Sequence, residues 1–220
     1  MDHSILALVA FIFTSAMTPG PNNIMLMTSG VNFGFWRTLP HMAGVSLGFP
    51  LMVLLIGVGF GTTILAMPWF HDAVSFIGIP YLLWLSWHIA SADTRHGLVK
   101  PGEHEGMAAK GAITRDEPRP MTFLGASAFQ WVNAKAWVMA IGMLAVYAPT
   151  GYGVMQGVAI VVAINLIIAI FSSITWTAFG SALSTWLKDP FRLRVFSVVM
   201  ALLLVATLLP PILDLWNRYA

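Results

Sequence analysis

Long apolar segments follow one another along nearly the whole chain, and they constrain its fold more than any other feature. Six of them stand out, at residues 4–28, 39–61, 73–91, 121–146, 152–181 and 192–213. Each can span a membrane, since a transmembrane helix needs about 20 predominantly apolar residues. Only 9% of the residues are charged, whereas a soluble domain carries about 25%. The sequence therefore predicts an all-α, polytopic membrane protein of about six transmembrane helices embedded in the lipid bilayer.

The rest of the composition excludes several classes of protein. A net charge of +2 is too small to indicate nucleic-acid binding. The chain has no cysteine, which excludes disulfides and cysteine-ligated metals. The residues before the first apolar segment lack the basic region of a signal peptide, so we expect that segment to be a retained helix. We expect no cofactor.

Basic residues fall on alternate connections between the predicted helices. Nine of the eleven lysines and arginines lie in or beside the first, third and fifth connections, and one, Arg218, lies on the opposite side. Because connections rich in lysine and arginine stay in the cytoplasm, this asymmetry predicts that those three connections are cytoplasmic. Both termini are then expected outside.

A polar stretch at 93–120 divides the predicted helices into two groups of three. It contains ten charged residues and several glycines and prolines, as expected for a loop. An odd number of crossings in each group inverts the second group relative to the first. The sequence therefore predicts two inverted three-helix repeats, at 1–92 and 121–220, joined by a cytoplasmic loop at 93–120.

A proline- and glycine-rich motif interrupts the first predicted helix. Its two prolines remove backbone donors and push the preceding residues out of helical geometry. In a membrane, the freed backbone groups must be buried in protein or face a water-filled cavity, and the N-terminus of a resumed helix attracts anions. The alternative is a kink with a purely structural role. We predict substrate-binding residues at Thr18, Pro19, Gly20, Pro21, Asn22 and Asn23.

Lys135 is the only basic residue deep within a predicted helix, and all nine acidic residues lie in loops or near helix ends. A cation in hydrocarbon costs at least ~2.5 kcal/mol and usually faces a cavity. We predict that Lys135 meets a substrate carboxylate and that Gln130 and Asn133 bind further polar groups. The alternatives are a lysine that extends to the membrane surface and amides that bridge helices. Asn165 is a further buried amide, which could either bind a polar substrate or bridge helices.

The sequence contains no convincing catalytic arrangement and no predicted metal site. No nucleophile–base pair is apparent, and no glycine-rich phosphate loop follows a strand. His96 and His104, eight residues apart in the polar loop, give only a weak indication of a metal.

Several of these segments resemble a known family. They are Met-Thr-Pro-Gly-Pro-Asn-Asn at 17–23, Gly-Phe-Trp-Arg at 34–37, Ala-Gly-Val-Ser-Leu-Gly at 43–48, Tyr-Leu-Leu-Trp-Leu at 81–85 and Gln-Trp-Val-Asn-Ala-Lys at 130–135. In them the chain resembles the lysine-exporter superfamily, specifically its homoserine/threonine-exporter-like branch. The resemblance implies six helices and proton-driven export of amino acids or their derivatives across the bacterial inner membrane. The resemblance is also compatible with assembly into a homo-oligomer.

One departure from the family concerns the fourth helix. The family commonly has Asn-Pro-Lys where this chain has Asn133, Ala134 and Lys135. Members that resemble the cysteine and O-acetylserine exporter also lack the proline. The change leaves a break in the fourth helix an open question and favours small neutral substrates.

We therefore expect a secondary exporter of small, neutral amino acids or their derivatives. A divalent-cation exporter is an alternative, and it would need acidic or histidine ligands clustered among the helices. A membrane subunit without transport activity would have no need for a broken helix and a buried lysine. A membrane enzyme would need a nucleophile, base or metal at membrane depth, so we expect no enzymatic activity.

Overall fold

The computed structural model describes residues 3–60, 68–91, 119–146, 149 and 152–219, and this part of the chain is helical with no strand. The predicted all-α class is confirmed. Most of the loop predicted at 93–120 lies outside the described residues, as do His96 and His104. In chain order the α-helices are α1 (His3–Met17), α2 (Pro21–Arg37), α3 (Leu39–Leu55), α5 (Pro68–Ala90), α6 (Phe123–Phe129), α7 (Ala134–Ile141), α8 (Val154–Leu183), α9 (Pro190–Ala206) and α10 (Leu209–Tyr219).

The predicted first and last helices had wrong boundaries. The first was expected to end at residue 28, but α2 continues to Arg37 because Thr28 and Ser29 are buried in the bundle rather than exposed in a loop. The last was expected to run from 192 to 213 as one helix. The structure instead ends α9 at Ala206 and starts α10 at Leu209, just before the Pro-Pro pair at 210–211. Proline fits the first turn of a helix but not its interior.

Two helices in the described residues are long and apolar enough to span a membrane by themselves, Leu39–Gly59 and Val154–Leu183. The pair Ile5–Met17 and Pro21–Arg37 passes the same test together, with a bend of 49° between its halves. The surface of α8 carries large apolar side chains such as Val154 and Ile167, which are 78% and 68% exposed. Such a surface fits lipid better than water. The number of six crossings stays a prediction.

Glycines bring the helices of the bundle into close contact. A Cβ on Gly180 of α8 would overlap the Met27 carbonyl of α2, and one on Gly30 of α2 would overlap the Thr177 carbonyl of α8. On α3, Gly44 meets α6 in the same way at the Phe123 carbonyl. Small residues at membrane helix interfaces allow this approach. The contacts hold α2 against α8 and α3 against α6.

We expect Gly180→Val to lower the stability of the folded protein by about 1–3 kcal/mol, the usual cost of overpacking. The helix backbones would have to separate, since the atom in the way is a carbonyl oxygen. Gly153→Val is the control, because a Cβ added at Gly153 makes only an ordinary contact of 3.8 Å with Gln156 Oε1, and its backbone angles of φ −63° and ψ 153° suit any residue. Thermal melts in detergent compare the variants. Equal melting temperatures for Gly180→Val and the wild type would contradict this packing.

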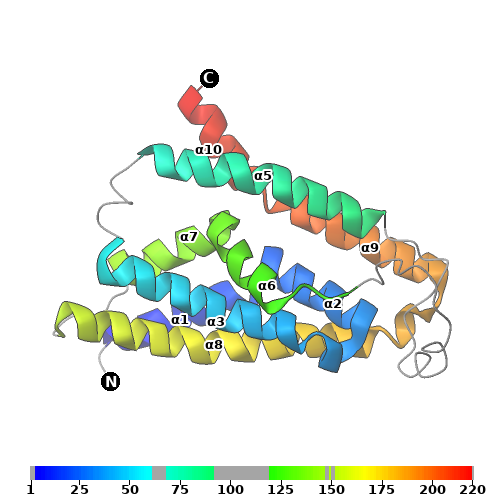
Figure 1. Cartoon of the computed structure of the whole chain (residues 1–220), viewed down its shortest axis with the longest axis horizontal. Coiled ribbons are helices and arrows are strands. Elements are labelled where there is room, and N and C mark those ends of the chain that lie inside the picture. The colour runs from blue at the N-terminus through cyan, green and yellow to red at the C-terminus, as the bar shows by residue number, and fades with distance from the viewer. Residues whose placement is uncertain (1–2, 61–67, 92–118, 147–148, 150–151, 220) are drawn as a thin grey trace, which may run out of the picture.

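Figure 1 shows how the helix ends gather at the two ends of the bundle. The α2–α3 turn and the α8–α9 connection lie toward its right end, while the N-terminus lies toward its left and the C-terminus projects at the top of the view. The turn that follows Arg37 and the connection that contains Lys188 are therefore at the same end of the bundle. The orientation predicted from the basic residues stays a prediction.

Candidate functional site

The first transmembrane segment is broken where its prolines lie. α1 ends at Met17 and α2 begins at Pro21, with Gly20 extended at φ −166° and ψ 176°. Pro19 and Pro21 have no N–H, so the carbonyls of Ser15 and Met17 cannot receive their usual helical hydrogen bonds. The break therefore places the carbonyl end of one half-helix beside the amide end of the next.

The fourth segment is broken as well, although it has no proline. α6 passes into a 3₁₀ turn at Gln130–Val132, and Asn133 leaves helical geometry at φ −87° and ψ 102°. The Asn133 side chain then caps α7 by accepting a hydrogen bond from the Lys135 backbone N–H at 3.2 Å. Asparagine is among the best N-cap residues. The Asn133 cap thus starts α7 with Ala134, and no proline, at the first helical position.

Hydrogen bonds join the two breaks. The side-chain amides of Asn22 and Gln130 donate to each other at 2.8 and 3.1 Å. Gln130 is fully buried and also donates to the Ala126 carbonyl at 2.8 Å. The Lys135 ammonium crosses to the other break and donates to the Thr18 carbonyl at 3.1 Å. The interrupted parts of two helices more than 100 residues apart thus form one polar centre.

The carbonyls at the end of α1 have side-chain donors. Asn23 Nδ2 donates to the carbonyls of Ala16 and Thr18 at 2.7 and 2.9 Å. Ser172 Oγ, from the middle of α8, donates to the Ala16 carbonyl at 2.8 Å. Because an unsatisfied buried carbonyl costs about 1–3 kcal/mol, these bonds stabilise the broken conformation. They also fix α8 against the break.

Lys135 packs closely against Gly20. A Cβ on Gly20 would lie 2.8 Å from Lys135 Nζ and 2.9 Å from its Cδ. Glycine is therefore required here by the approach of the lysine and not by the backbone angles, which any residue can adopt. Among the described residues, no acidic side chain lines the space around the ammonium. Its partner is the neutral Thr18 carbonyl at the C-terminal, partly negative end of α1.

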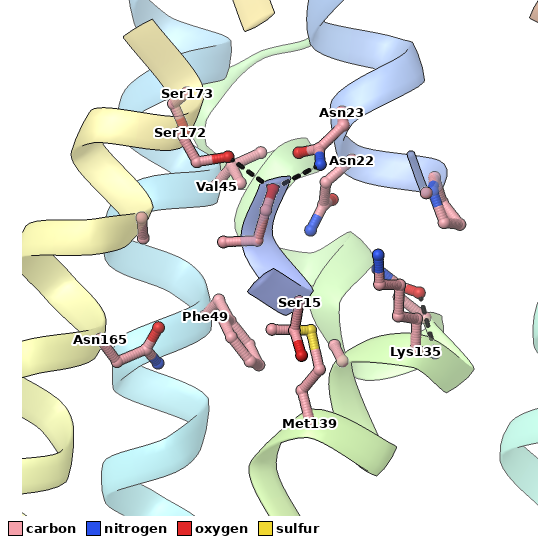
Figure 2. A pocket seen from close by; sticks show the side chains of 16 residues that line it. Ser15, Asn22, Asn23, Val45, Phe49, Lys135, Met139, Asn165, Ser172 and Ser173 are labelled. Atoms are coloured by element: carbon pink, nitrogen blue, oxygen red, sulfur yellow. Dashed lines mark hydrogen bonds between the residues drawn. The ribbon is translucent and has the colours of Figure 1, made fainter. Parts of the chain in front are cut away.

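A cavity of about 50 Å³ opens between the two breaks and α8. By this measure one water needs about 10–15 Å³, so the cavity accommodates a few waters or a small molecule. Figure 2 shows Lys135 on one side of the α1 end and Asn165 on the other. The lining residues are Ser15, Ala16, Gly20, Pro21, Asn22, Asn23, Val45, Phe49, Asn133, Lys135, Ala136, Met139, Asn165, Ala169, Ser172 and Ser173.

Six of the nine predicted site residues line this cavity, and they are Gly20, Pro21, Asn22, Asn23, Asn133 and Lys135. The other three do not. Thr18 supplies only its backbone carbonyl to the centre, Gln130 lies behind Asn22, and Pro19 serves to end α1. Ser172 and Ser173 line the cavity but were not among the predicted site residues, although adjacent serines inside an apolar helix are a signal for them. Asn165, predicted as a buried amide, also lines it.

The described residues contain no group of three or more histidine, cysteine, aspartate or glutamate side chains that could hold a metal ion. His41, in the first turn of α3, is 2% exposed, and neither ring nitrogen has a hydrogen-bond partner in the described structure.

Comparison with known proteins assigns the chain to a family. Residues 13–209 match the family described as LysE type translocator. The cysteine/O-acetylserine efflux proteins of Escherichia coli (strain K12) and Shigella sonnei (strain Ss046) are each 29% identical over 196 residues, covering 89% of this chain and 90% of each relative. No solved structure matches. The chain belongs to the LysE type translocator family and is therefore a membrane transport protein rather than an enzyme.

Proposed function

We propose that this protein exports small, neutral amino acids or their derivatives from the cytoplasm, and that the substrate binds as a zwitterion between the two helix breaks. The observation that carries the proposal is the position of Lys135. Its ammonium lies beside a cavity where helix ends of both polarities meet, and no acidic side chain lines that cavity among the described residues.

The carboxylate end of the substrate is matched by Lys135 and by the start of α2. The first backbone N–H groups of a helix lack helical partners and carry partial positive charge, and Asn22 and Asn23 occupy this position. A carboxylate forms stronger hydrogen bonds with an ammonium than a neutral carbonyl does. We therefore expect the substrate to draw Lys135 away from the Thr18 carbonyl.

The ammonium end of the substrate is matched by the last turn of α1. The carbonyls of Ser15 and Met17 lack helical donors because Pro19 and Pro21 have no N–H. A helix C-terminus carries partial negative charge and favours cations. The arrangement corresponds to transporters in which interrupted helices bind charged groups near the middle of the membrane.

The size and lining of the cavity favour a small substrate. About 50 Å³ leaves room for few heavy atoms beyond the zwitterionic group. Lys135 is the only charged side chain among the lining residues in the described structure, so a charged substrate side chain would find no counter-ion. The relatives named as cysteine/O-acetylserine efflux proteins point to substrates of this kind.

We also propose that export is coupled to the proton gradient. No carboxylate is among the described lining residues, which leaves a histidine, Lys135, the substrate itself or an indirect coupling as the ways to link transport to a proton. His41, close to the α2–α3 turn, is buried. Neither of its ring nitrogens has a hydrogen-bond partner in the described part of the chain. A pH gradient imposed across the proteoliposome membrane should change the rate of amino-acid transport, and reversing the gradient should reverse that change.

The packing of the helices supports the proposed inverted repeats. Under that symmetry α1 and α2 correspond to α6 and α7, α3 to α8, and α5 to α9. Taken as whole segments, the observed pairs follow this exchange, because the broken segment α1–α2 packs on α8 and the broken segment α6–α7 packs on α3, while α3–α8 and α5–α9 each pair corresponding helices. The half that makes most of the contact differs between the repeats, since it is α2 in the first and α6 in the second. A pseudo-twofold axis of this kind relates the two halves of many transporters.

The proposed orientation places both termini outside and the 93–120 loop in the cytoplasm. Since the chain has no cysteine, Ala108→Cys in that loop and Gly153→Cys before α8 introduce single reactive thiols. A membrane-impermeant thiol reagent applied to intact cells should label only Gly153→Cys, and lysis should expose Ala108→Cys. Labelling of Ala108→Cys in sealed cells would refute the orientation.

Transport into proteoliposomes tests the function directly. The purified protein should move small neutral amino acids, detected with a panel that includes alanine, serine, cysteine and O-acetylserine, together with arginine and a divalent cation. We expect transport of the neutral members only. Movement of the cation without any amino acid would overturn the proposal in favour of a metal exporter.

A further inference from the structure

Asn165 is a polar residue of the cavity that makes no hydrogen bond to either helix break in the described structure. Four asparagines line the cavity, and Asn22, Asn23 and Asn133 each make hydrogen bonds across or at a break. The fourth, Asn165 of α8, is 1% exposed, and its Nδ2 has no partner in the described residues. Figure 2 shows its amide directed toward the side of the cavity formed by Phe49 and Ser15.

The surroundings of Asn165 make this unsatisfied amide costly. Val161 and Ile168, one turn away on each side in α8, belong to an apolar cluster that also includes Phe49. A leucine at position 165 would extend that cluster without leaving a polar group unpaired. Buried polar groups in native structures almost always have partners, so a lone amide facing a cavity indicates a ligand that supplies one.

Asn165 lies away from the centre that joins the breaks. It precedes Ser172 by seven residues, or about 10 Å along the helix at 1.5 Å per residue. Ser172 contacts the end of α1, so the cavity extends from the break toward the apolar wall of α8. A substrate whose zwitterionic group lies at the breaks, with its carboxylate on Lys135, would direct its side chain toward this wall.

We propose that Asn165 selects the substrate through a hydrogen bond to a polar atom of the substrate side chain. This inference rests on the proposed function. The free Nδ2 is a donor, and it needs an acceptor such as a hydroxyl or carbonyl oxygen. The preferred class is amino acids with a short oxygen-bearing side chain, in preference to alkyl side chains of the same size.

Pairs of amino acids that differ only by hydroxyl for methyl test the selection. Serine is compared with 2-aminobutyrate, and homoserine with norvaline, by calorimetric titration of the purified protein in detergent. We expect the wild type to bind the hydroxyl member about tenfold more tightly or better, because a site built to hydrogen-bond a hydroxyl discriminates against analogues that lack it. In Asn165→Leu the ratio should fall to about one while alanine affinity is retained.

The control is Ile168→Leu, a change of similar volume in the same buried part of α8, which should keep the wild-type ratio. If Asn165→Leu does not fold, Asn165→Ala takes its place, with a melt to confirm the fold. An unchanged hydroxyl preference in a folded Asn165 variant would overturn this role and would mean that the amide holds only a structural water. Failure of every amino acid to bind the wild type would instead overturn the proposed function.

Discussion

Replacement of Lys135 by methionine should remove amino-acid binding while leaving the protein folded. Loss of one partner from a buried, hydrogen-bonded charge pair costs about 2–5 kcal/mol, which corresponds to a rise in Kd of at least about 30-fold. The fold should tolerate the change, because the Thr18 carbonyl keeps its hydrogen bond from Asn23. The desolvation cost of a half-buried cation also disappears, so the melting temperature should stay equal or rise.

Calorimetric titration with a transported amino acid, alongside a thermal melt, measures both effects. Lys135→Arg keeps the charge but changes its shape and hydration, so it should bind more weakly than the wild type and more tightly than Lys135→Met. If Lys135 has only a structural role, Lys135→Met should instead have a lower melting temperature. The fraction that remains folded should then bind the amino acid with normal affinity.

Replacement of Gly20 by leucine should abolish transport. Even the first atom of the new side chain would lie 2.8 Å from Lys135 Nζ, so the lysine would be displaced and the cavity filled. The displaced atoms belong to the flexible end of a side chain, and we therefore expect the protein to remain folded in the membrane. Gly20→Ala should have a smaller effect of the same kind.

The control for Gly20→Leu is Gly153→Leu, since a Cβ at Gly153 makes only an ordinary contact of 3.8 Å with Gln156 Oε1. Transport rates in proteoliposomes, normalised to the amount of reconstituted protein, provide the comparison. Normal transport by Gly20→Leu would show that the first break is only a kink. Should that variant fail to accumulate, the rate of Gly20→Ala decides the question.

The break in the first segment was predictable from sequence because proline acts locally. Pro19 and Pro21 lack N–H groups in any context, so a continuous helix through them is unfavourable. The break in the fourth segment was not predictable in this way. It depends on the Asn133 cap and on Trp137, whose indole N–H donates to the Trp131 carbonyl at 3.0 Å. These interactions exist only in the folded segment.

The contribution of α8 to the cavity was only partly predictable from sequence. α8 is a continuous apolar helix with no breaking residue near Ser172, so its local signals are Asn165 and the adjacent serines, which do not tell where the helix packs. Its serines reach the cavity because small residues such as Gly30 and Gly180 let α8 and α2 approach. Burial of Thr28 and Ser29 by the bundle similarly explains why the first segment extends beyond its predicted end.

The central claim is that Lys135 binds the carboxylate of the substrate, and a thermodynamic cycle tests it most directly. The cycle compares binding of a transported amino acid and of the matching amine without the carboxylate, to the wild type and to Lys135→Met. If the two groups interact, removing the carboxylate should weaken binding at least as much as removing the Lys135 ammonium, and removing both should cost little more than removing the carboxylate alone. If the losses are additive, Lys135→Met should bind the amine more weakly than the wild type does. That result would contradict the claim.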